Sequence, residues 1–522
     1  MQIIDNKALR LRVRSGLERF RVIPKHFVED VPGGHEVTVF WGLDETRVLK
    51  NLGFRNVPSP IERTYDWPGR WRPMDHQRTT AGFLTLHRRA FCFNDPGTGK
   101  TLSALWAADY LMKRGEVRRT LIVCPLSIMQ TAWMGDITNS VLHRSAAIAH
   151  HAKASRRIEI IQGDYEFVII NYDGLKLVAN EIKADERFDL VIVDEANAYA
   201  NPSTDRWKAL ASIVGPETFL WMMTGTPAAQ SPEHAYGLAR LVCPSNVPEF
   251  AGSWKDKVML KIRNFKWIPK PDAKQIVFDA LQPAVRFAKE DCLDLPPVMK
   301  ETRFVPLTAQ QAKYYEKLKN AQLVIAAGEV ISAVNKAALV NKLLQVSCGG
   351  VYSENGQVVE FDATPRFNLL REVLEETDRK VLIFAMFRSS IDGIATYMER
   401  HGIKVGVIHG GVTATKRAAL ITDFQTQPHI QVLVMQPQAT AHGITLTAAD
   451  TVVFFGPVMS VELYLQCIAR SDRKGQTSDK VRVIHIQSSP VEKRMFDAMD
   501  GRVTDHAILS KMFDEEMEAK IM

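Results

Sequence analysis

Residues 91 to 101 are the stretch whose residue types and spacing point most directly to chemistry. They read Phe-Cys-Phe-Asn-Asp-Pro-Gly-Thr-Gly-Lys-Thr, which is an apolar run followed by a loop with two glycines. This is the layout of a phosphate-binding loop, because glycines without a Cβ let main-chain N–H groups close around phosphate oxygens. Lys100 would reach the outer phosphates, and the hydroxyl of Thr101 would bind Mg²⁺.

The loop departs from the usual GxxxxGK[ST] pattern at one position, since Asn94 stands where the first glycine is expected. A plain turn from a strand into a helix is therefore an alternative interpretation of this stretch. The residues that we expect to bind the phosphates of a nucleotide are Asp95, Pro96, Gly97, Thr98, Gly99, Lys100 and Thr101.

Two acidic residues, Asp194 and Glu195, follow a stretch at 189 to 193 that is apolar from Leu190 onward. Continuous apolar runs that alternate with helical segments indicate a parallel sheet covered on both faces. Ligands of such sheets bind at the carboxyl ends of the strands, so the acids and the loop can converge. Asp194 would hold Mg²⁺, and Glu195 would take a proton from an attacking water. The alternative is an ordinary helix N-terminus, where acids are favoured anyway.

Length, composition and charge limit the class of protein that this sequence can form. A chain of 522 residues with 46% hydrophobic residues is globular and long enough for two or three domains. The net charge of +7 permits a polyanionic partner without requiring one. The six cysteines are scattered, so we expect reduced thiols and no disulfide partner. No apolar run approaches the ~20 residues that a membrane span needs.

A second set of apolar runs, at 380–387, 405–408, 431–435 and 451–455, indicates another α/β unit that lacks a phosphate loop of its own. Near its end we expect a helix over 466–476 on which Arg470 and Arg473 share a face. Two fork-shaped, always charged side chains can neutralise a departing phosphate. Most arginine pairs on helices are simply solvated, which is the alternative.

Several motifs in order resemble those of one family. Gln77, the loop at 97–101, the segments 121–127 and 194–197, and 224–227 are similar to the first-lobe motifs of superfamily-two helicases, above all the Swi/Snf-like DNA translocases. Residues 466–476 resemble the arginine-finger motif of the same family. The resemblance covers about residues 71 to 513. Asn197 departs from the usual histidine, and Ala469 and Asp472 depart from the usual neighbours of the arginines.

The resemblance implies an α/β fold with two RecA-like lobes and ATP in the cleft between them. Gln77 would read the adenine, because its amide both donates and accepts, and Gly443 would join the ATP site. Arg470 and Arg473 would complete the site when the lobes close. Motif position also implies contacts with nucleic acid from Ser127, Asn171, Thr226, His409, Gly410 and Thr445.

The expected domains are an N-terminal accessory region (1–70), the ATP-binding lobe (71–300), a helical protrusion (301–348) and a second lobe (349–522). Residues 228–300 look like a helical and irregular insert. Its segment 254–274 alternates lysines with aromatic residues, which suits either phosphate contacts with base stacking or an amphipathic surface whose aromatics turn inward.

The resemblance implies an ATP-dependent DNA translocase that uses Mg²⁺ and remodels DNA or protein–DNA complexes. Its expected partner is double-stranded DNA bound with low sequence specificity, and we expect a monomer in the cytoplasm of a bacterium or of an infected bacterial host. Three alternatives stay open: a strand-separating helicase, the motor part of a larger assembly, and an ATP-gated nucleic-acid clamp with little catalysis.

Overall fold

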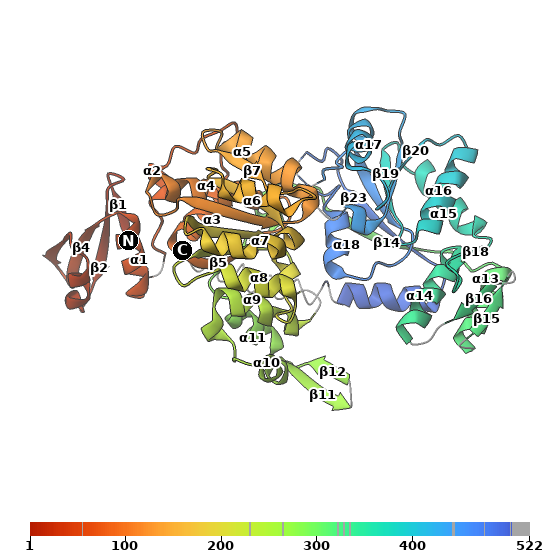
Figure 1. The fold of residues 1–522 in the computed structure, drawn as a ribbon, viewed down its shortest axis with the longest axis horizontal. Helices are drawn as coiled ribbons and strands as arrows, with labels where there is room; N and C mark the ends of the chain where they lie inside the picture. Colours follow the sequence, from red (N-terminus) through yellow and green to blue (C-terminus); the bar gives the residue numbers. More distant parts are fainter. Residues whose placement is uncertain are drawn as a thin grey trace. The chain divides into compact units, whose positions relative to one another are not determined.

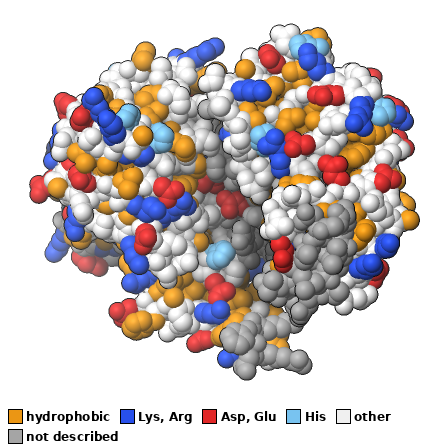
Figure 2. Space-filling model, turned by 45° about the vertical axis from the view of Figure 1, so that its right-hand side comes forward, with side chains coloured by type: hydrophobic (Ala, Val, Ile, Leu, Met, Phe, Trp, Pro, Cys, Tyr) orange, Lys and Arg blue, Asp and Glu red, His pale blue; other side chains and the backbone are white. Residues whose placement is uncertain are grey.

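The structure is a computed structural model that describes residues 1–54, 56–228, 231–263, 266–320, 323–326, 329–332, 336–440, 444–473, 475–501 and 503. The chain divides into two compact units, with the division after Cys292 (Figure 1). Figure 2 shows basic and acidic side chains interspersed over one face of the molecule, in keeping with the modest net charge.

The N-terminal region is a four-stranded antiparallel sheet with one helix. In spatial order its strands are β1 (Gln2–Ile4), β2 (Ala8–Val13), β4 (Gly34–Phe40) and β3 (His26–Val31). Helix α1 (Leu43–Asn51) follows β4, and a short helix, α2 (Ile61–Thr64), precedes the main body. Alternate residues such as Leu9 and Leu11 face the core, as a half-buried strand requires.

The main sheet of the first unit is seven-stranded and wholly parallel. In spatial order its strands are β13 (Ala284–Val285), β5 (Arg89–Cys92), β10 (Phe219–Met223), β9 (Phe188–Asp194), β6 (Arg119–Cys124), β8 (Phe167–Asn171) and β7 (Ala146–Ile148).

Helices cover both faces of this sheet. Phe91 belongs to a core with α6 (Ala154–Gln162), α7 (Tyr172–Ala184), α8 (Asp205–Ile213), α9 (Ala235–Val242) and α11 (Ala273–Ala280). Its neighbours Ala90 and Cys92 belong to the opposite core, with α3 (Asp75–Leu86), α4 (Lys100–Lys113) and α5 (Gly135–Ser140). Adjacent residues of one strand thus face different cores, which explains the continuous apolar runs and confirms the parallel, doubly covered sheet.

The segment before the division contains more strand than the sequence indicated. After α10 (Ala251–Val258), strands β11 (Met259–Arg263) and β12 (Lys266–Pro269) form an antiparallel hairpin that projects beyond α10 (Figure 1). Trp254 is buried, and Trp267 packs partly against the core with the Lys255 ammonium 4.7 Å from its ring centroid. These two aromatics therefore turn inward, which favours the amphipathic alternative. Phe265 lies outside the described residues.

The second unit is built on a six-stranded parallel sheet. In spatial order its strands are β14 (Val298–Phe304), β23 (Val481–Gln487), β22 (Ala449–Phe454), β19 (Lys380–Phe384), β21 (Val432–Met435) and β20 (Val405–Ile408). Helices α15 (Thr364–Glu375) and α16 (Arg388–Arg400) share a core with one face. The second unit also contains α17 (Ala414–Thr426) and α18 (Val461–Ile468), and Tyr464 of α18 packs on Phe454 with ring centroids 4.8 Å apart.

The limits of the second unit differ in detail from the expected ones. The boundary expected at residue 300 falls inside β14, which pairs with β23 along its whole length. The expected helical protrusion contains α13 (Ala309–Asn320) and α14 (Lys336–Ser347), but a hairpin of β15 (Leu323–Ala326) and β16 (Glu329–Ser332) interrupts it.

A further hairpin and a last helix complete the second unit. Strands β17 (Gly350–Tyr352) and β18 (Val358–Glu360) form the hairpin after α14. The last described helix spans residues 490–501. Among the residues that the structure describes, no helix is long and apolar enough to cross a membrane.

Candidate active site

The phosphate loop joins the carboxyl end of β5 to the N-terminus of α4. Gly97 and Gly99 adopt φ angles of 92° and 82°, in the left-handed region that favours glycine. A Cβ on Gly99 would also lie 2.0 Å from the amide nitrogen of Gln77, so a side chain there would displace that amide. The positive end of α4 faces this loop, where anions are favoured.

Lys100 is the first residue of α4, and its ammonium group donates to the main-chain carbonyl of Asn94 at 2.8 Å. Within the described part of the chain, no carboxylate lies within ion-pair distance of this ammonium group. The loop is braced by Thr98, whose hydroxyl donates to the carbonyl of Asp95 at 2.8 Å. Lys100 can therefore exchange a neutral carbonyl for a phosphate oxygen without breaking an ion pair.

Asp194 is the last residue of β9, and Glu195 follows it. The Asp194 carboxylate is buried and accepts hydrogen bonds from the indole N–H of Trp133 and from the main-chain N–H of Glu195, both at 3.0 Å. Burial raises the pKa of Asp194, and the nearby Lys100 ammonium opposes that rise. Glu195 itself has a φ angle of 49°, an unusual conformation for a residue with a side chain and one that clusters at functional sites.

The loop after β10 lies between the phosphate loop and the acids, because β10 separates β5 from β9 in the sheet. Asn197 reaches into it: its amide nitrogen lies 3.1 Å from the Thr224 hydroxyl and from both oxygens of Thr226. On the other side, a Cβ on Gly225 would lie 2.7 Å from the ring of Pro96. Asparagine at 197 thus makes hydrogen bonds to the loop that follows the neighbouring strand.

Gln77 lies on α3 and is buried beside the phosphate loop. Its amide N–H donates to the Thr98 carbonyl at 3.1 Å, and its amide oxygen accepts from the main-chain N–H of Met74 at 3.0 Å. A ring nitrogen of His76 lies 2.9 Å from the same Thr98 carbonyl. The structure thus places Gln77 against the loop, and its contact with adenine stays a prediction.

The donor set at this edge of the sheet fits a nucleotide with its magnesium ion. Thr101 and Asp194 offer the hard oxygen ligands that Mg²⁺ prefers, while Lys100 and the loop N–H groups match phosphate. Among the described residues there is no cluster of three or more His, Cys, Asp or Glu side chains that could hold a metal. Mg²⁺ commonly takes one or two protein oxygens and fills its shell with water and substrate phosphates.

Three candidate nucleic-acid contacts also lie at strand ends of the first unit. Ser127 is exposed in a short 3₁₀ helix (Leu126–Ile128) after β6. Asn171 ends β8, and its side-chain oxygen accepts from Arg157 at 3.3 Å. Thr226 is buried and bonded to Asn197. Since all strands of the sheet are parallel, these residues share one edge with the nucleotide-binding residues.

The two candidate arginines lie beyond a helix, and the expectation of a helix over 466–476 is wrong. Helix α18 ends at Ile468, and Arg470 and Arg473 lie in the turns that follow. Tertiary contacts end the helix, since the Arg470 carbonyl accepts from the Leu446 N–H at 2.8 Å and Gln476 donates to the Ala449 carbonyl at 2.8 Å. The structure still brings the arginines together, through contacts with residues 444 and 445.

These contacts define the arginine site of the second unit. Arg470 and Arg473 donate to the Ile444 carbonyl at 3.2 and 3.1 Å, and Arg473 also donates to the Thr445 hydroxyl at 3.1 Å. Thr445, a candidate DNA contact, is therefore engaged with a candidate catalytic residue. Gly443 lies outside the described residues.

His409 and Gly410 follow β20 at the carboxyl edge of the second sheet. A ring nitrogen of His409 accepts from the Gly411 N–H at 2.9 Å and lies 2.9 Å from the guanidinium of Arg388. The Gly410 N–H donates to the side chain of Gln436 at 3.4 Å. Arg388 is a positive charge at this edge that the sequence analysis missed. The position of Arg388 directly after the run at 380–387 could have indicated that it lies at this edge.

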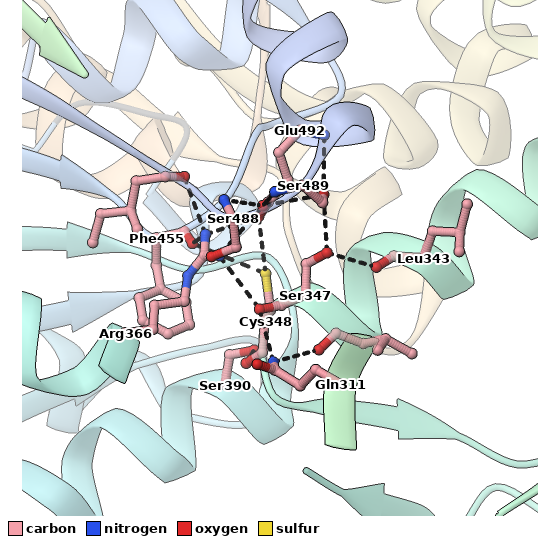
Figure 3. Close-up of polar contacts among 12 residues, drawn as sticks. Gln311, Leu343, Ser347, Cys348, Arg366, Ser390, Phe455, Ser488, Ser489 and Glu492 are labelled. Carbon is pink, nitrogen blue, oxygen red and sulfur yellow. Dashed lines mark hydrogen bonds and ion pairs between the residues drawn. The ribbon is translucent and has the colours of Figure 1, made fainter. Parts of the chain in front are cut away.

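A buried ion pair holds several elements of the second unit together (Figure 3). Arg366 of α15 and Glu492 of the last helix lie 2.8 Å apart, and both are almost fully buried. Arg366 also donates to the carbonyls of Phe455 and Ile486 at the ends of β22 and β23. Glu492 accepts from the N–H groups of Ser488 and Ser489 at 2.7 and 3.1 Å, and the Ser489 hydroxyl lies 3.0 Å from that of Ser347, at the end of α14.

Comparison with known proteins gives the chain its family. Residues 76–347 match the model of the SNF2-related domain, which is more than half of the chain, and residues 365–475 match that of the helicase conserved C-terminal domain. The chain belongs to the Swi/Snf-like helicases. The resemblance read from the motifs and the fold class of two parallel α/β sheets are both confirmed.

Individual relatives of this Swi/Snf-like protein are distant. It is 24% identical over 418 residues to a Xenopus tropicalis SWI/SNF-related matrix-associated actin-dependent regulator of chromatin subfamily A-like protein 1, covering 78% of this chain and 41% of that one. It is 25% identical over 428 residues to a Danio rerio chromodomain-helicase-DNA-binding protein 1-like, covering 75% and 39%. The chain thus spans about two fifths of the length of these relatives.

One solved structure with similarity to the chain is a Sulfolobus solfataricus SWI2/SNF2 ATPase core in complex with dsDNA. The identity is 19% and the TM-score is 0.41, over 87% of this chain and 98% of that one.

Proposed function

We propose that this Swi/Snf-like protein is a DNA-dependent ATPase that moves along duplex DNA and remodels DNA or protein–DNA complexes. The observation that supports this most is the grouping of Lys100, Thr101, Asp194 and Glu195 at one edge of the first parallel sheet. These are the side chains that hydrolysis of a magnesium-bound nucleotide requires, and they occupy the family's motif positions.

In this proposal the first unit binds the nucleotide. The N–H groups of the loop and Lys100 hold the phosphates, Thr101 and Asp194 hold Mg²⁺, and Gln77 contacts the adenine. Glu195 orients or deprotonates the attacking water. The bound Mg²⁺ supplies charge neutralisation at the reacting phosphate.

The second unit contributes Arg470 and Arg473 to the same reaction. Their charges stabilise the phosphate in transfer when the two units close, so hydrolysis depends on closure. DNA bound to both units favours the closed arrangement, and each cycle of closing and opening advances the protein along the backbone.

DNA contacts come from the strand-end residues of each sheet, among them Ser127 and Asn171 in the first and His409 and Gly410 in the second. Small polar side chains and main-chain N–H groups at such positions suit phosphates better than base edges. Sequence specificity is therefore low, and binding weakens steeply as salt rises.

The deciding experiment measures ATP hydrolysis at low salt without nucleic acid and then with duplex DNA, single-stranded DNA and RNA, with Lys100→Ala as the inactive control. Strong stimulation by duplex DNA, together with displacement of a third strand from a triplex, supports the translocase. A preference for single strands with unwinding of a duplex supports the strand-separating helicase. Turnover that is indifferent to all three overturns the proposal.

A further inference from the structure

The first two polar residues of the phosphate loop bind a segment nearly two hundred residues away. The side-chain oxygen of Asn94 accepts from the Phe287 N–H at 3.1 Å. One carboxylate oxygen of Asp95 accepts from the Arg286 guanidinium at 2.8 Å, and the other accepts from the Lys289 N–H at 3.0 Å. The Asp95 N–H also donates to the Phe287 carbonyl at 3.1 Å. Both side chains therefore bind residues 286–289.

This contact is charge-assisted and partly buried, since the Asp95 side chain is 22% exposed. Asn94 is fully buried and Arg286 is 4% exposed. Arg286 also donates to the Phe93 carbonyl at 2.7 Å, directly before the loop. Hydrogen bonds between ionised partners are stronger than neutral ones, and burial strengthens them further. The segment is thus fixed to the loop more firmly than the short strand β13 alone would fix it.

The segment leads out of the first unit. Lys289, whose N–H binds Asp95, is the first residue of α12 (Lys289–Cys292). Cys292 is both the end of this helix and the last residue before the division between the units. A displacement of the loop main chain near Asp95 would therefore act on the chain close to the point where it passes into the second unit.

We propose that Asn94, Asp95 and Arg286 couple the phosphate loop to residues 284–292, so that nucleotide binding and release shift the chain where it leaves the first unit. Arg286 is the positioning residue of this link, since it contacts the loop from outside. The inference rests on the proposed function, because a loop that binds no nucleotide has nothing to transmit.

The link also explains why the loop departs from the GxxxxGK[ST] pattern. Asn94 does not adopt a positive φ angle, so its conformation does not call for glycine. Its amide joins two elements, because the amide nitrogen donates to the Thr80 hydroxyl of α3 at 2.8 Å while the oxygen accepts from Phe287. Asn94→Gly would restore the pattern but remove both bonds, and we expect it to weaken the link.

Hydrogen exchange on the full chain tests the link without DNA. We compare wild type, Arg286→Met, Asn94→Gly and the control Thr80→Val, with and without a non-hydrolysable ATP analogue and Mg²⁺. In wild type, the analogue should slow exchange of loop amides and of residues 284–292. In Arg286→Met and Asn94→Gly, the loop should still respond, while the response of 284–292 should fall about fivefold or more. Thr80→Val removes the bond between Asn94 and α3 but keeps the contacts with residues 286–289, and it should respond as wild type does.

The second measurement compares ATP turnover with affinity for the analogue. Arg286→Met should lower DNA-stimulated turnover about tenfold while the Kd for the analogue changes less than about threefold, and Arg286→Lys should recover part of the loss. The proposal is overturned if residues 284–292 of wild type ignore the analogue, or if Arg286→Met loses nucleotide affinity in proportion to turnover. A wild type that shows the linked exchange response but no stimulation by DNA would refute the proposed function and leave the link intact.

Discussion

The guanidinium groups of Arg470 and Arg473 donate to one and the same acceptor, the main-chain carbonyl oxygen of Ile444, at 3.2 and 3.1 Å. Two permanent positive charges at such close range repel each other, and the shared acceptor offsets part of that repulsion. The result is a concentrated positive site in the second unit, built without the helix that the spacing predicted. Such a site matches a group whose negative charge increases during the reaction.

Arg473→Ala should abolish most ATP turnover and leave nucleotide binding nearly unchanged. Arg473 is the less buried of the two arginines, and an arginine that acts on the transferring phosphate is worth about a thousandfold or more in turnover. Steady-state hydrolysis and equilibrium binding of a fluorescent ATP analogue separate the two effects. Arg400→Ala, an exposed arginine at the end of α16, is the matched control. Equal losses in binding and turnover would show that Arg473 supports the fold instead.

Glu195→Gln should bind ATP but hydrolyse it at least about a hundredfold more slowly, because the amide keeps the shape of the side chain and cannot take a proton. Lys100→Ala should lose both binding and hydrolysis, since it removes the positive charge at the phosphates. Single-turnover hydrolysis with the enzyme in excess measures the chemical step directly. Normal turnover in Glu195→Gln would remove this glutamate from the mechanism.

The strand ends that carry these residues were predictable from the sequence. Apolar runs such as 190–193 are buried on both faces and so lack polar interruptions, and a polar residue that ends the run marks the edge of the sheet. This is why the sequence indicated that Asp194, Glu195 and the phosphate loop lie at strand ends, where the structure has them. The hairpins β11–β12 and β15–β16 were missed, since short strands with mixed side chains give weak periodicity.

Contacts between distant residues could not be predicted. Arg286 and Asp95 are 191 positions apart, and nothing in either local sequence indicates the pairing. The end of α18 is similar, because hydrogen bonds to residues 446 and 449 stop a helix that local sequence would continue. The local sequence pattern therefore locates helices and strands, while their exact ends and the contacts between them depend on the tertiary structure.

Asn197 should matter as a hydrogen-bond donor between the acids and the loop after β10. Asn197→Asp keeps the size but cannot donate to Thr224 or Thr226, and it adds a negative charge. We expect DNA-stimulated turnover to fall about tenfold in this variant, the equivalent of one lost buried hydrogen bond. Asn197→His retains a donor and should stay closer to wild type. Identical turnover in both variants would mean that donation by this residue is unimportant.

Breaking the Arg366–Glu492 pair should destabilise the second unit by about 3–5 kcal/mol, because either partner alone leaves an uncompensated buried charge. The test compares Arg366→Met and Glu492→Gln with the double variant, which should be less destabilised than the two single losses added together. All nine tryptophans precede residue 293, so tryptophan emission reports the first unit and hydrogen exchange must report the second. Additive losses would show that the two side chains act independently.

Stability of the second unit should fall as the pH drops from about 6.5 toward 4, because His485 is buried in its neutral form. Its ring lies 2.9 Å from the Tyr464 hydroxyl and stacks on Phe496 with centroids 4.3 Å apart. Burial lowers the pKa of His485 to about 4, and Lys300 adds to the effect while Asp500 opposes it.

Stability falls on acidification because unfolding lets His485 take up a proton that the folded protein excludes. In the unfolded chain this histidine titrates near its usual pKa of about 6.5, so between that pH and about 4 the unfolded state binds the extra proton. The contribution of the neutral ring is fully present above pH 6.5 and is lost at up to about 1.4 kcal/mol per pH unit below it. Urea unfolding at pH 7, 6 and 5, followed by exchange in residues 449–487, measures the slope. His485→Gln cannot titrate in this range, so its free energy of unfolding should change less steeply with pH, by the equivalent of about one proton. An equal pH dependence in both proteins would assign the acid sensitivity to other groups.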